Sequence, residues 1–382
     1  MARVRLIQER SDVAAEHYAL FDELAALRGR ISGPSSVTLH SPGLARPWNE
    51  ISEFLHRLSV VEPQHAELAV CATAREFDCG YIWAAHVRQA REGGVSEQAI
   101  QATAEDALLD ALPPQEALVV EYVRQLIRNR RVDDGVFDQL LKTHGSRWLV
   151  ELTAWIGRYA ALAGILNAFE VLAAADAEKL PMRKSRGEVL PSRQIRPPAA
   201  VPRINPMTAR EQVGSEDGSV FDAVAAGRGR VGAPFSLLLY SPPLCQRVLE
   251  LSDYLRQDSY LSSNVRELTT IATARERDCP YVWAAHAPAA RRAGVSDTVI
   301  EAVRDRSELE ASEVEGEVIE FVQQVLGRHE VEPGLFDRMV AAHSLQGVVE
   351  LTAVVGHYVF VTSILNAFEV APAADGEALP LG

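Results

Sequence analysis

One short stretch of the sequence places a carboxylate, a thiol and an imidazole at fixed intervals. Glu67 is followed twelve residues later by Cys79, and His86 lies seven residues beyond that cysteine. If a helix begins at Cys79, then Cys79, Trp83 and His86 fall on one face of it. An imidazole titrates near neutral pH and can carry protons, and a nearby carboxylate can orient the ring or balance its charge. The spacing therefore predicts acid–base chemistry by His86 and Glu67.

The same stretch occurs twice. A shift of 200 positions superimposes ELAVCATAREFDCGYIWAAH, from Glu67, on ELTTIATARERDCPYVWAAH, from Glu267. Further on, a shift of 199 superimposes VELTAWIGRYAALAGILNAFEV, from Val150, on VELTAVVGHYVFVTSILNAFEV, from Val349. About two thirds of the positions in the first window are identical, which is typical of a duplicated domain. The second copy of the candidate site consists of Glu267, Cys279, Tyr281, Trp283 and His286.

The cysteines indicate a second kind of chemistry. Pro280 directly follows Cys279, and proline is favoured in the first turn of a helix, so the cysteine should precede that turn. A thiol there lies at the positive end of the helix dipole, which lowers its pKa and favours the nucleophilic thiolate. The structural alternative is that the cysteines and tryptophans are core residues and that each histidine is a buried ring bonded to backbone.

Apolar residues recur at three- and four-residue intervals through each copy, which is the period of the α-helix. In the first copy this pattern predicts helices over residues 50–60, 66–76, 80–92, 96–104, 115–130, 134–144 and 148–168. Strand-like alternation is nearly absent. The sequence thus predicts an all-α protein made of two helical bundles.

A segment rich in proline and arginine separates the two copies. It reads RKSRGEVLPSRQIRPPAA, and its prolines, basic residues and small residues favour an extended surface connector. We predict a first domain at residues 1–182, a linker at 183–200 and a second domain at 201–382. Each domain is long enough to bury a core of its own.

The composition is that of a globular protein with an acidic surface. Hydrophobic residues make up 47% of the chain, charged residues 24%, and the formal net charge is -14. This charge opposes binding to nucleic acid and to anionic lipid. The sequence has no unbroken apolar run long enough to span a membrane, and its first residues lack the apolar stretch of a signal peptide. We expect a cytoplasmic protein that binds neither nucleic acid nor membrane.

The four cysteines, at positions 71, 79, 245 and 279, form no C-x-x-C pair and no zinc-finger spacing. We therefore expect reduced thiols, no metal site and no cofactor.

Glu67, Cys79 and His86 resemble the alkylhydroperoxidase-D active-site signature, which reads E, eleven residues, C-x-x-C, three residues, H. The segments GRISGPSSVTLHSP and ILNAFEV, with their second copies, are similar to the carboxymuconolactone decarboxylase branch of the same superfamily. The resemblance covers essentially the whole chain and implies two tandem alkylhydroperoxidase-D-like helical bundles. Single-domain relatives assemble through helix packing, so it also implies a homo-oligomer, a dimer or trimer of these chains.

Both copies depart from the two family patterns at one position. The second cysteine of the peroxidase signature falls on Ile82 and Val282, so no C-x-x-C disulfide can close. The decarboxylase branch commonly has a glutamate there, between a tyrosine and a tryptophan. Tyr81 and Trp83 keep that aromatic frame without the acid.

We expect a cofactor-independent lyase or isomerase of the carboxymuconolactone decarboxylase type, in which a Glu/His pair moves protons on a small oxygenated organic substrate. The alternatives are a peroxiredoxin-like thiol peroxidase with one cysteine per domain and a non-catalytic ligand-binding module. The expected catalytic residues are Glu67, Cys79, His86, Glu267, Cys279 and His286; the expected substrate-binding residues are Tyr81, Trp83, Asn167, Tyr281, Trp283 and Asn366.

Two conditions accompany this expectation. Arg158 is matched by His357 in the second copy, so the two sites need not do the same job. Activity also requires that the carboxylate, thiol and imidazole of each half face one shared cavity.

Overall fold

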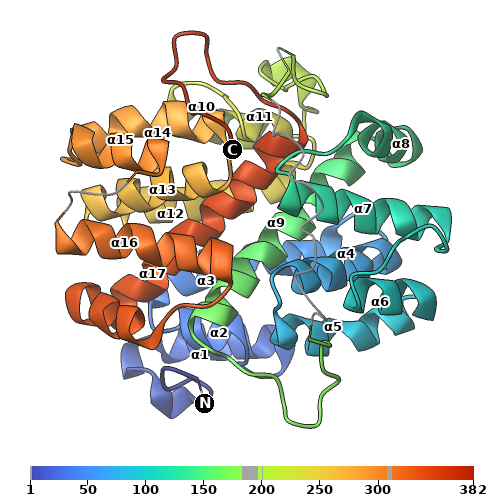
Figure 1. Cartoon of the computed structure of the whole chain (residues 1–382), viewed down its shortest axis with the longest axis horizontal. Coiled ribbons are helices and arrows are strands. Elements are labelled where there is room, and N and C mark those ends of the chain that lie inside the picture. The colour runs from blue at the N-terminus through green and yellow to red at the C-terminus, as the bar shows by residue number, and fades with distance from the viewer. Residues whose placement is uncertain (1, 183–196, 200, 308–311) are drawn as a thin grey trace.

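The computed structural model describes residues 2–182, 197–199, 201–307 and 312–382, and these residues form helices and turns with no strand among them (Figure 1). The helices of the first half are α1 (Tyr18–Arg28), α2 (Pro34–Thr38), α3 (Pro42–Leu58), α4 (Pro63–Glu76), α5 (Gly80–Glu92), α6 (Glu97–Ala104), α7 (Pro114–Arg128), α8 (Asp134–His144) and α9 (Ser146–Ala168). Those of the second half are α10 (Gly218–Arg228), α11 (Phe235–Leu238), α12 (Pro242–Gln257), α13 (Ser263–Glu276), α14 (Pro280–Arg292), α15 (Asp297–Asp305), α16 (Glu313–Gln323) and α17 (Pro333–Ala367).

The predicted all-α class is confirmed. Each of the seven helices predicted for the first half is present as one of α3 to α9, and several begin at a proline, where the missing N–H costs no hydrogen bond. Two short helices, α1 and α2, were not predicted. Of the predicted linker, residues 183–196 and 200 lie outside the described part of the chain.

The order of the helices in the first half recurs in the second, with one difference near the end. In the first half Gly145, at φ 84°, separates α8 from α9. In the second half the equivalent stretch is the single helix α17, which contains a break at Ser344, where φ is 64°. The long apolar part of α17 that follows Ser344 is the counterpart of α9.

The two long helices α9 and α17 pass each other at the centre of the molecule (Figure 1). Glycines permit this approach. A Cβ atom on Gly356 would lie 2.9 Å from the Cβ of Ala161, and one on Gly157 would lie 3.0 Å from the Cα of Phe360. A larger residue at either position would force the helices apart.

Buried carboxylates join the two halves in a reciprocal way. Ser41 of the first half donates a hydrogen bond to Glu350, with 2.6 Å between the oxygens, and Ser241 of the second half donates to Glu151 over 2.7 Å. Both glutamates are fully buried. Hydrophobic residues of both halves belong to one continuous main core, and a smaller separate cluster that includes Phe21 and Leu24 lies in the first half.

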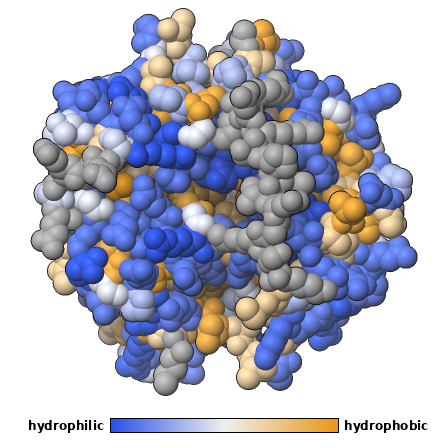
Figure 2. Space-filling model, in the orientation of Figure 1, coloured by the Kyte–Doolittle hydropathy of each residue, from blue (hydrophilic) through white to orange (hydrophobic). Residues whose placement is uncertain are grey.

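Helices α9 and α17 are also long and apolar enough, by length and composition, to cross a membrane. Their most apolar windows are 100% and 94% buried inside the protein, which is the position of a core helix. On the face of the molecule shown in Figure 2, hydrophilic residues cover most of the surface and hydrophobic residues are scattered between them. The apolar character of the two helices is accounted for by packing within the protein.

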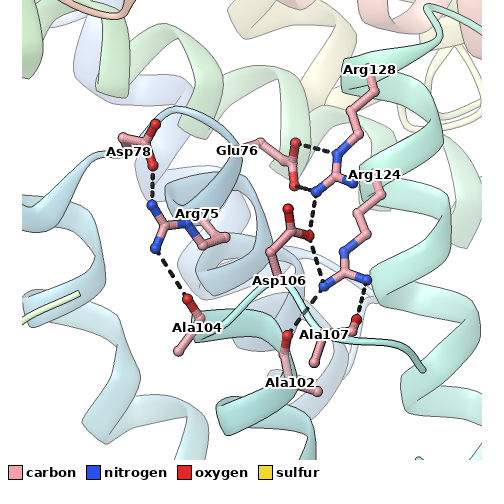
Figure 3. Close-up of polar contacts among 9 residues, drawn as sticks. All are labelled: Arg75, Glu76, Asp78, Ala102, Ala104, Asp106, Ala107, Arg124 and Arg128. Atoms are coloured by element: carbon pink, nitrogen blue, oxygen red, sulfur yellow. Dashed lines mark hydrogen bonds and ion pairs between the residues drawn. The ribbon is translucent and has the colours of Figure 1, made fainter. Parts of the chain in front are cut away.

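An arginine network holds the ends of α4, α6 and α7 together in the first half (Figure 3). Arg128 donates to both carboxylate oxygens of Glu76, over 2.7 and 2.5 Å, and to Asp106 over 2.5 Å. Arg124 lies 3.2 Å from the same aspartate. Glu76 is buried, so this pairing also compensates the loss of its hydration.

Candidate active site

The turn between α4 and α5 is built alike in both halves. Arg75 pairs with Asp78, and Arg275 pairs with Asp278 over 2.8 Å. The two aspartates have φ values of 49° and 44°, a left-handed conformation that allows the chain to reverse sharply. The turn fixes where the next helix begins, and therefore which of its residues face back toward α4 and α13.

The predicted Glu–His pairs are brought together in both halves. His86 on α5 lies with its Nδ1 atom 2.8 Å from Oε2 of Glu67 on α4. The Nδ1 atom of His286 on α14 lies 2.8 Å from Oε2 of Glu267 on α13. A carboxylate at this atom favours the tautomer in which Nδ1 carries the proton and Nε2 carries the lone pair.

The first pair borders a cavity of about 330 Å³, which we call the first pocket. The His86 side chain is 12% exposed and lines this cavity together with Tyr81 and Ile82. Within the described part of the chain, its Nε2 atom has no hydrogen-bond partner. The lone pair of His86 is therefore open to a molecule in the first pocket.

Sequence reasoning missed a second histidine in the first pocket. His56 on α3 lies with its ring centroid 6.1 Å from that of His86, and its Nε2 atom is 2.8 Å from the hydroxyl of Tyr159. Both residues line the pocket. Tyr159 is matched by Tyr358 in the second half, and this recurrence could have indicated that Tyr159 is a site residue. His56 is matched by Arg256, so the comparison of the two copies did not indicate His56.

A buried cation also lines the first pocket. Arg158 is 2% exposed, donates to the hydroxyl of Ser52 over 2.8 Å and to the carbonyl of Trp48 over 2.7 Å, and stacks over the Trp48 ring. A guanidinium stays protonated at all ordinary pH values. The first pocket therefore has a permanent positive charge in its wall.

The second pocket, of about 360 Å³, borders Glu267 and His286. The hydroxyl of Tyr358 lies 3.2 Å from Nε2 of His286 and can donate a hydrogen bond to its lone pair. The equivalent lone pair of His86, in the first pocket, has no such donor among the described residues. Burial opposes ionisation of Glu267, but the hydrogen bond and charge of His286 outweigh it and lower the pKa of this carboxyl below its usual value.

His357 stands in the second pocket where the first has Arg158. It is 4% exposed, and burial together with the nearby charge of Arg228 lowers its pKa to about 3. The ring is therefore neutral at pH 7. The second pocket lacks the buried cation of the first.

The placement expected for the two cysteines is wrong. Cys79 and Cys279 do precede α5 and α14, as predicted, but they are 0% and 1% exposed and line neither pocket. Burial raises the pKa of Cys79 to about 12 and that of Cys279 to about 11, although backbone N–H groups act in the opposite direction. Desolvation thus outweighs the helix dipole, and the expected low pKa is also wrong.

The expected substrate-binding residues divide into two groups. Tyr81 and Tyr281 line the first and second pockets. Trp83 and Trp283 do not line them, because both side chains lie in the hydrophobic core. The expectation that these tryptophans form pocket walls is therefore corrected.

Asn167 and Asn366 also lie away from the pockets. Their amide nitrogens donate to the carbonyls of Phe77 and Arg277, each over 2.8 Å. These carbonyls belong to the turns between α4 and α5 and between α13 and α14. The two asparagines hold those turns in place instead of lining the pockets, which corrects the expectation that they contact substrate.

A comparison with known protein families finds a match in the second half of the chain. The model of the carboxymuconolactone decarboxylase family matches residues 242–321, which extend from the start of α12 into α16 and include Glu267 and His286. No curated protein matches the chain. This match and the all-helical fold support a likeness to the carboxymuconolactone decarboxylase and alkylhydroperoxidase-D-like superfamily, and the matched segment lies in the second half of the chain.

Proposed function

We propose that the first pocket is the active site of a cofactor-independent lyase or isomerase that acts on a small oxygenated organic substrate with an acidic C–H bond. The observation that carries the proposal is the Glu67–His86 pair, which leaves Nε2 of His86 open to the pocket. The imidazole is oriented as a general base, and the carboxylate can stabilise the imidazolium that forms.

The proposed reaction begins when Nε2 of His86 removes a proton from the carbon next to a substrate carbonyl. The C–H bond breaks, an N–H bond forms, and the electron pair moves onto the carbonyl oxygen as an enolate. The positive charge of Arg158 favours this oxyanion. Return of the proton to a different carbon gives isomerisation; in a decarboxylation, the same N–H protonates the carbon that CO₂ has left.

The hydrogen-bonded His56 and Tyr159 supply a second route for a proton. The two imidazole rings of the pocket are stacked with an interplanar angle of 19°. A substrate bound in the pocket beside both rings can lose a proton to one ring and gain one from the other, or from the tyrosine hydroxyl. The second pocket has Arg256 in place of His56 and lacks this pair.

Two observations weigh against a thiol peroxidase. Cys79 is fully buried and lines neither pocket, and its raised pKa of about 12 keeps it a thiol at neutral pH. A purely ligand-binding role would be favoured by a His86 ring bonded only to backbone, whereas its partner is a carboxylate.

The proposal is tested by hydrogen exchange at carbon. The full chain is incubated in D₂O with a panel of small lactones and β-keto acids, and loss of the C–H signal next to the carbonyl is followed by NMR. We expect the wild-type protein to accelerate exchange of at least one compound, and His86→Gln to slow it about 100-fold or more, as for loss of a general base.

The matched control is His286→Gln, in which Tyr358 already occupies the equivalent atom. This variant should keep most of the exchange activity. Unchanged exchange in His86→Gln, an equal loss in both variants, or no exchange with any compound would contradict the proposal. Circular dichroism of each variant checks that the helices are intact.

Association of the chain into a dimer or trimer and a cytoplasmic location stay predictions. Leu58, the last residue of α3, and Tyr260, between α12 and α13, are each 57% exposed and are candidate contact residues between chains. Light scattering coupled to size-exclusion chromatography measures the mass of the assembly, and a mass equal to that of one chain contradicts this prediction.

A further inference from the structure

The second pocket has two arginines that the first pocket lacks. Arg256 lines it at the position that corresponds to His56, and Arg230 lines it from the loop before α11. The counterpart of Arg230 is Arg30, which does not line the first pocket but borders a separate hollow beside Gln8. The second pocket therefore offers a ligand two guanidinium groups at positions where the first pocket offers none.

In the described part of the chain, the guanidinium groups of these two arginines have no partner by hydrogen bond or ion pair, although the charge of Arg256 acts on Glu267. Arg228, the third arginine of the pocket, donates to Asp253 over 2.8 Å. Within the described residues, by contrast, neither Arg230 nor Arg256 makes a hydrogen bond or ion pair. Both are exposed at the pocket, so each guanidinium keeps its donors for water or for a ligand.

A second, independent group in the same pocket also lacks a partner. The Nδ1 atom of His357 is buried and makes no hydrogen bond with any residue in the described part of the chain. A buried polar atom without a partner is costly, and such an exception points to a ligand or water that completes it. The ring is neutral, since its pKa is about 3, so it can exchange a hydrogen bond with an uncharged group of a ligand.

The remaining wall of the second pocket is largely apolar. Phe235, Val282, Val361 and Leu365 line it between the charged and polar groups. An inorganic anion would leave these side chains without contacts. A carboxylate attached to a small hydrocarbon body would use both the arginines and the apolar wall.

We propose that the second pocket binds a small organic carboxylate, which places its charge between Arg230 and Arg256, its apolar body against Val282 and Val361, and a hydrogen-bonding group near His357. This site is distinct from the proton-transfer site of the first pocket. Binding of the carboxylate to the second pocket requires no reaction, so it can be measured without an activity assay.

Isothermal titration calorimetry of the full chain tests the proposal, with benzoate, 4-hydroxybenzoate, benzamide and inorganic phosphate as probes. We expect one benzoate per chain, and much weaker binding of benzamide, which has the same shape without the charge. Phosphate should also bind more weakly than benzoate, because it lacks an apolar body. Arg230→Gln and Arg256→Gln should each weaken benzoate binding about tenfold, the loss expected for a charge-assisted hydrogen bond.

The matched control is Arg30→Gln, which changes the counterpart of Arg230 and should leave benzoate binding unchanged. If 4-hydroxybenzoate binds more tightly than benzoate, His357→Phe should remove that advantage; equal affinities would remove His357 from the site. Absence of binding by both benzoates, unchanged affinity in the Arg230→Gln, Arg256→Gln double variant, or a loss in Arg30→Gln overturns the proposal. His86→Gln should bind benzoate normally, so failure of this proposal is separable from failure of the proton-transfer proposal.

Discussion

The first and second pockets contain the same Glu–His pair with the same 2.8 Å contact, yet they present different atoms to a ligand. In the first, Nε2 of His86 is open and a buried guanidinium, that of Arg158, lies in the wall. In the second, the Tyr358 hydroxyl lies 3.2 Å from Nε2, and two of the arginines in the wall, Arg230 and Arg256, are exposed. The Glu–His pair alone therefore does not determine which groups a pocket offers to a ligand. The residues around the pair determine this.

The tyrosine shows how a small change produces this difference. Tyr159 and Tyr358 occupy equivalent positions, but the first reaches toward His56 and the second toward His286. Where His56 is absent, because the chain has Arg256 instead, the hydroxyl takes the remaining imidazole as its partner. The residue at this position of α3 or α12 thus differs together with the availability of the base on α5 or α14.

The largest effect on stability is expected at the crossing of α9 and α17, where the two helices pack most closely. Gly356→Ala would place a methyl group 2.9 Å from both the Cβ of Ala161 and the ring of Trp48. Overpacking of this kind should lower the free energy of unfolding by about 2 to 3 kcal/mol. Urea denaturation followed by circular dichroism measures the change.

Gly157→Ala, at the equivalent position of α9, should have a similar cost, because its methyl group would lie 3.0 Å from the backbone of Phe360. Gly227→Ala on α10 is the control, since nothing lies within 4 Å of its added atom, and it should be neutral or slightly stabilising. A cost at only one of the two crossing glycines would show that the halves are not packed alike.

A smaller effect is expected on how the free energy of unfolding depends on pH, and it distinguishes the second pocket from the first. His357 has a pKa of about 3 in the folded chain against an ordinary value of 6.5, so the unfolded chain binds a proton first as the pH falls. Stability from the neutral ring is present above pH 6.5 and is lost progressively from there toward pH 3. Between pH 7 and 5 the wild type should lose about 2 kcal/mol more unfolding free energy than His357→Gln.

The comparison at the equivalent position of the first pocket is Arg158→Gln. Its guanidinium does not titrate in this range, so the cost of the substitution should be the same at pH 7 and at pH 5. Denaturation curves at the two pH values give both numbers. A pH-independent difference for His357→Gln would contradict a neutral buried ring.

The smallest effect concerns the reactivity of the two imidazoles. Diethyl pyrocarbonate acylates the unprotonated nitrogen of histidine, and mass spectrometry reports each site separately. We expect His86 to react about fivefold to tenfold faster than His286, because the Tyr358 hydrogen bond must be broken first. Tyr358→Phe should bring the two rates together. Equal rates in the wild type would mean that the hydroxyl does not protect His286.

The sequence predicted the helices and the two Glu–His pairs because both depend on local spacing. Apolar periodicity defines α3 to α9, and Glu67 and His86, which are 19 positions apart, belong to one helix–turn–helix unit whose geometry has little freedom. The pairs were therefore predictable without any knowledge of the rest of the fold.

The remaining site residues depend on contacts between distant segments. His56 reaches the first pocket from α3, and no pattern near it marks it out. Cys79 precedes a helix as predicted, but its exposure is decided by the helices that cover it, so the dipole argument alone gave the wrong pKa. Asn167 lies far along the chain from the turn that it binds.

The reciprocal hydrogen bonds from Ser41 and Ser241 to the buried carboxylates of Glu350 and Glu151 separate the residues that join the halves from the residues that line the pockets. Each half completes the other with identical residue types, and none of these serines and glutamates lines either pocket. Substitutions such as that of His56 by Arg256 can therefore change one site without disturbing the assembly that holds the other. A single chain in this way holds two chemically unlike pockets in a fixed relation to each other.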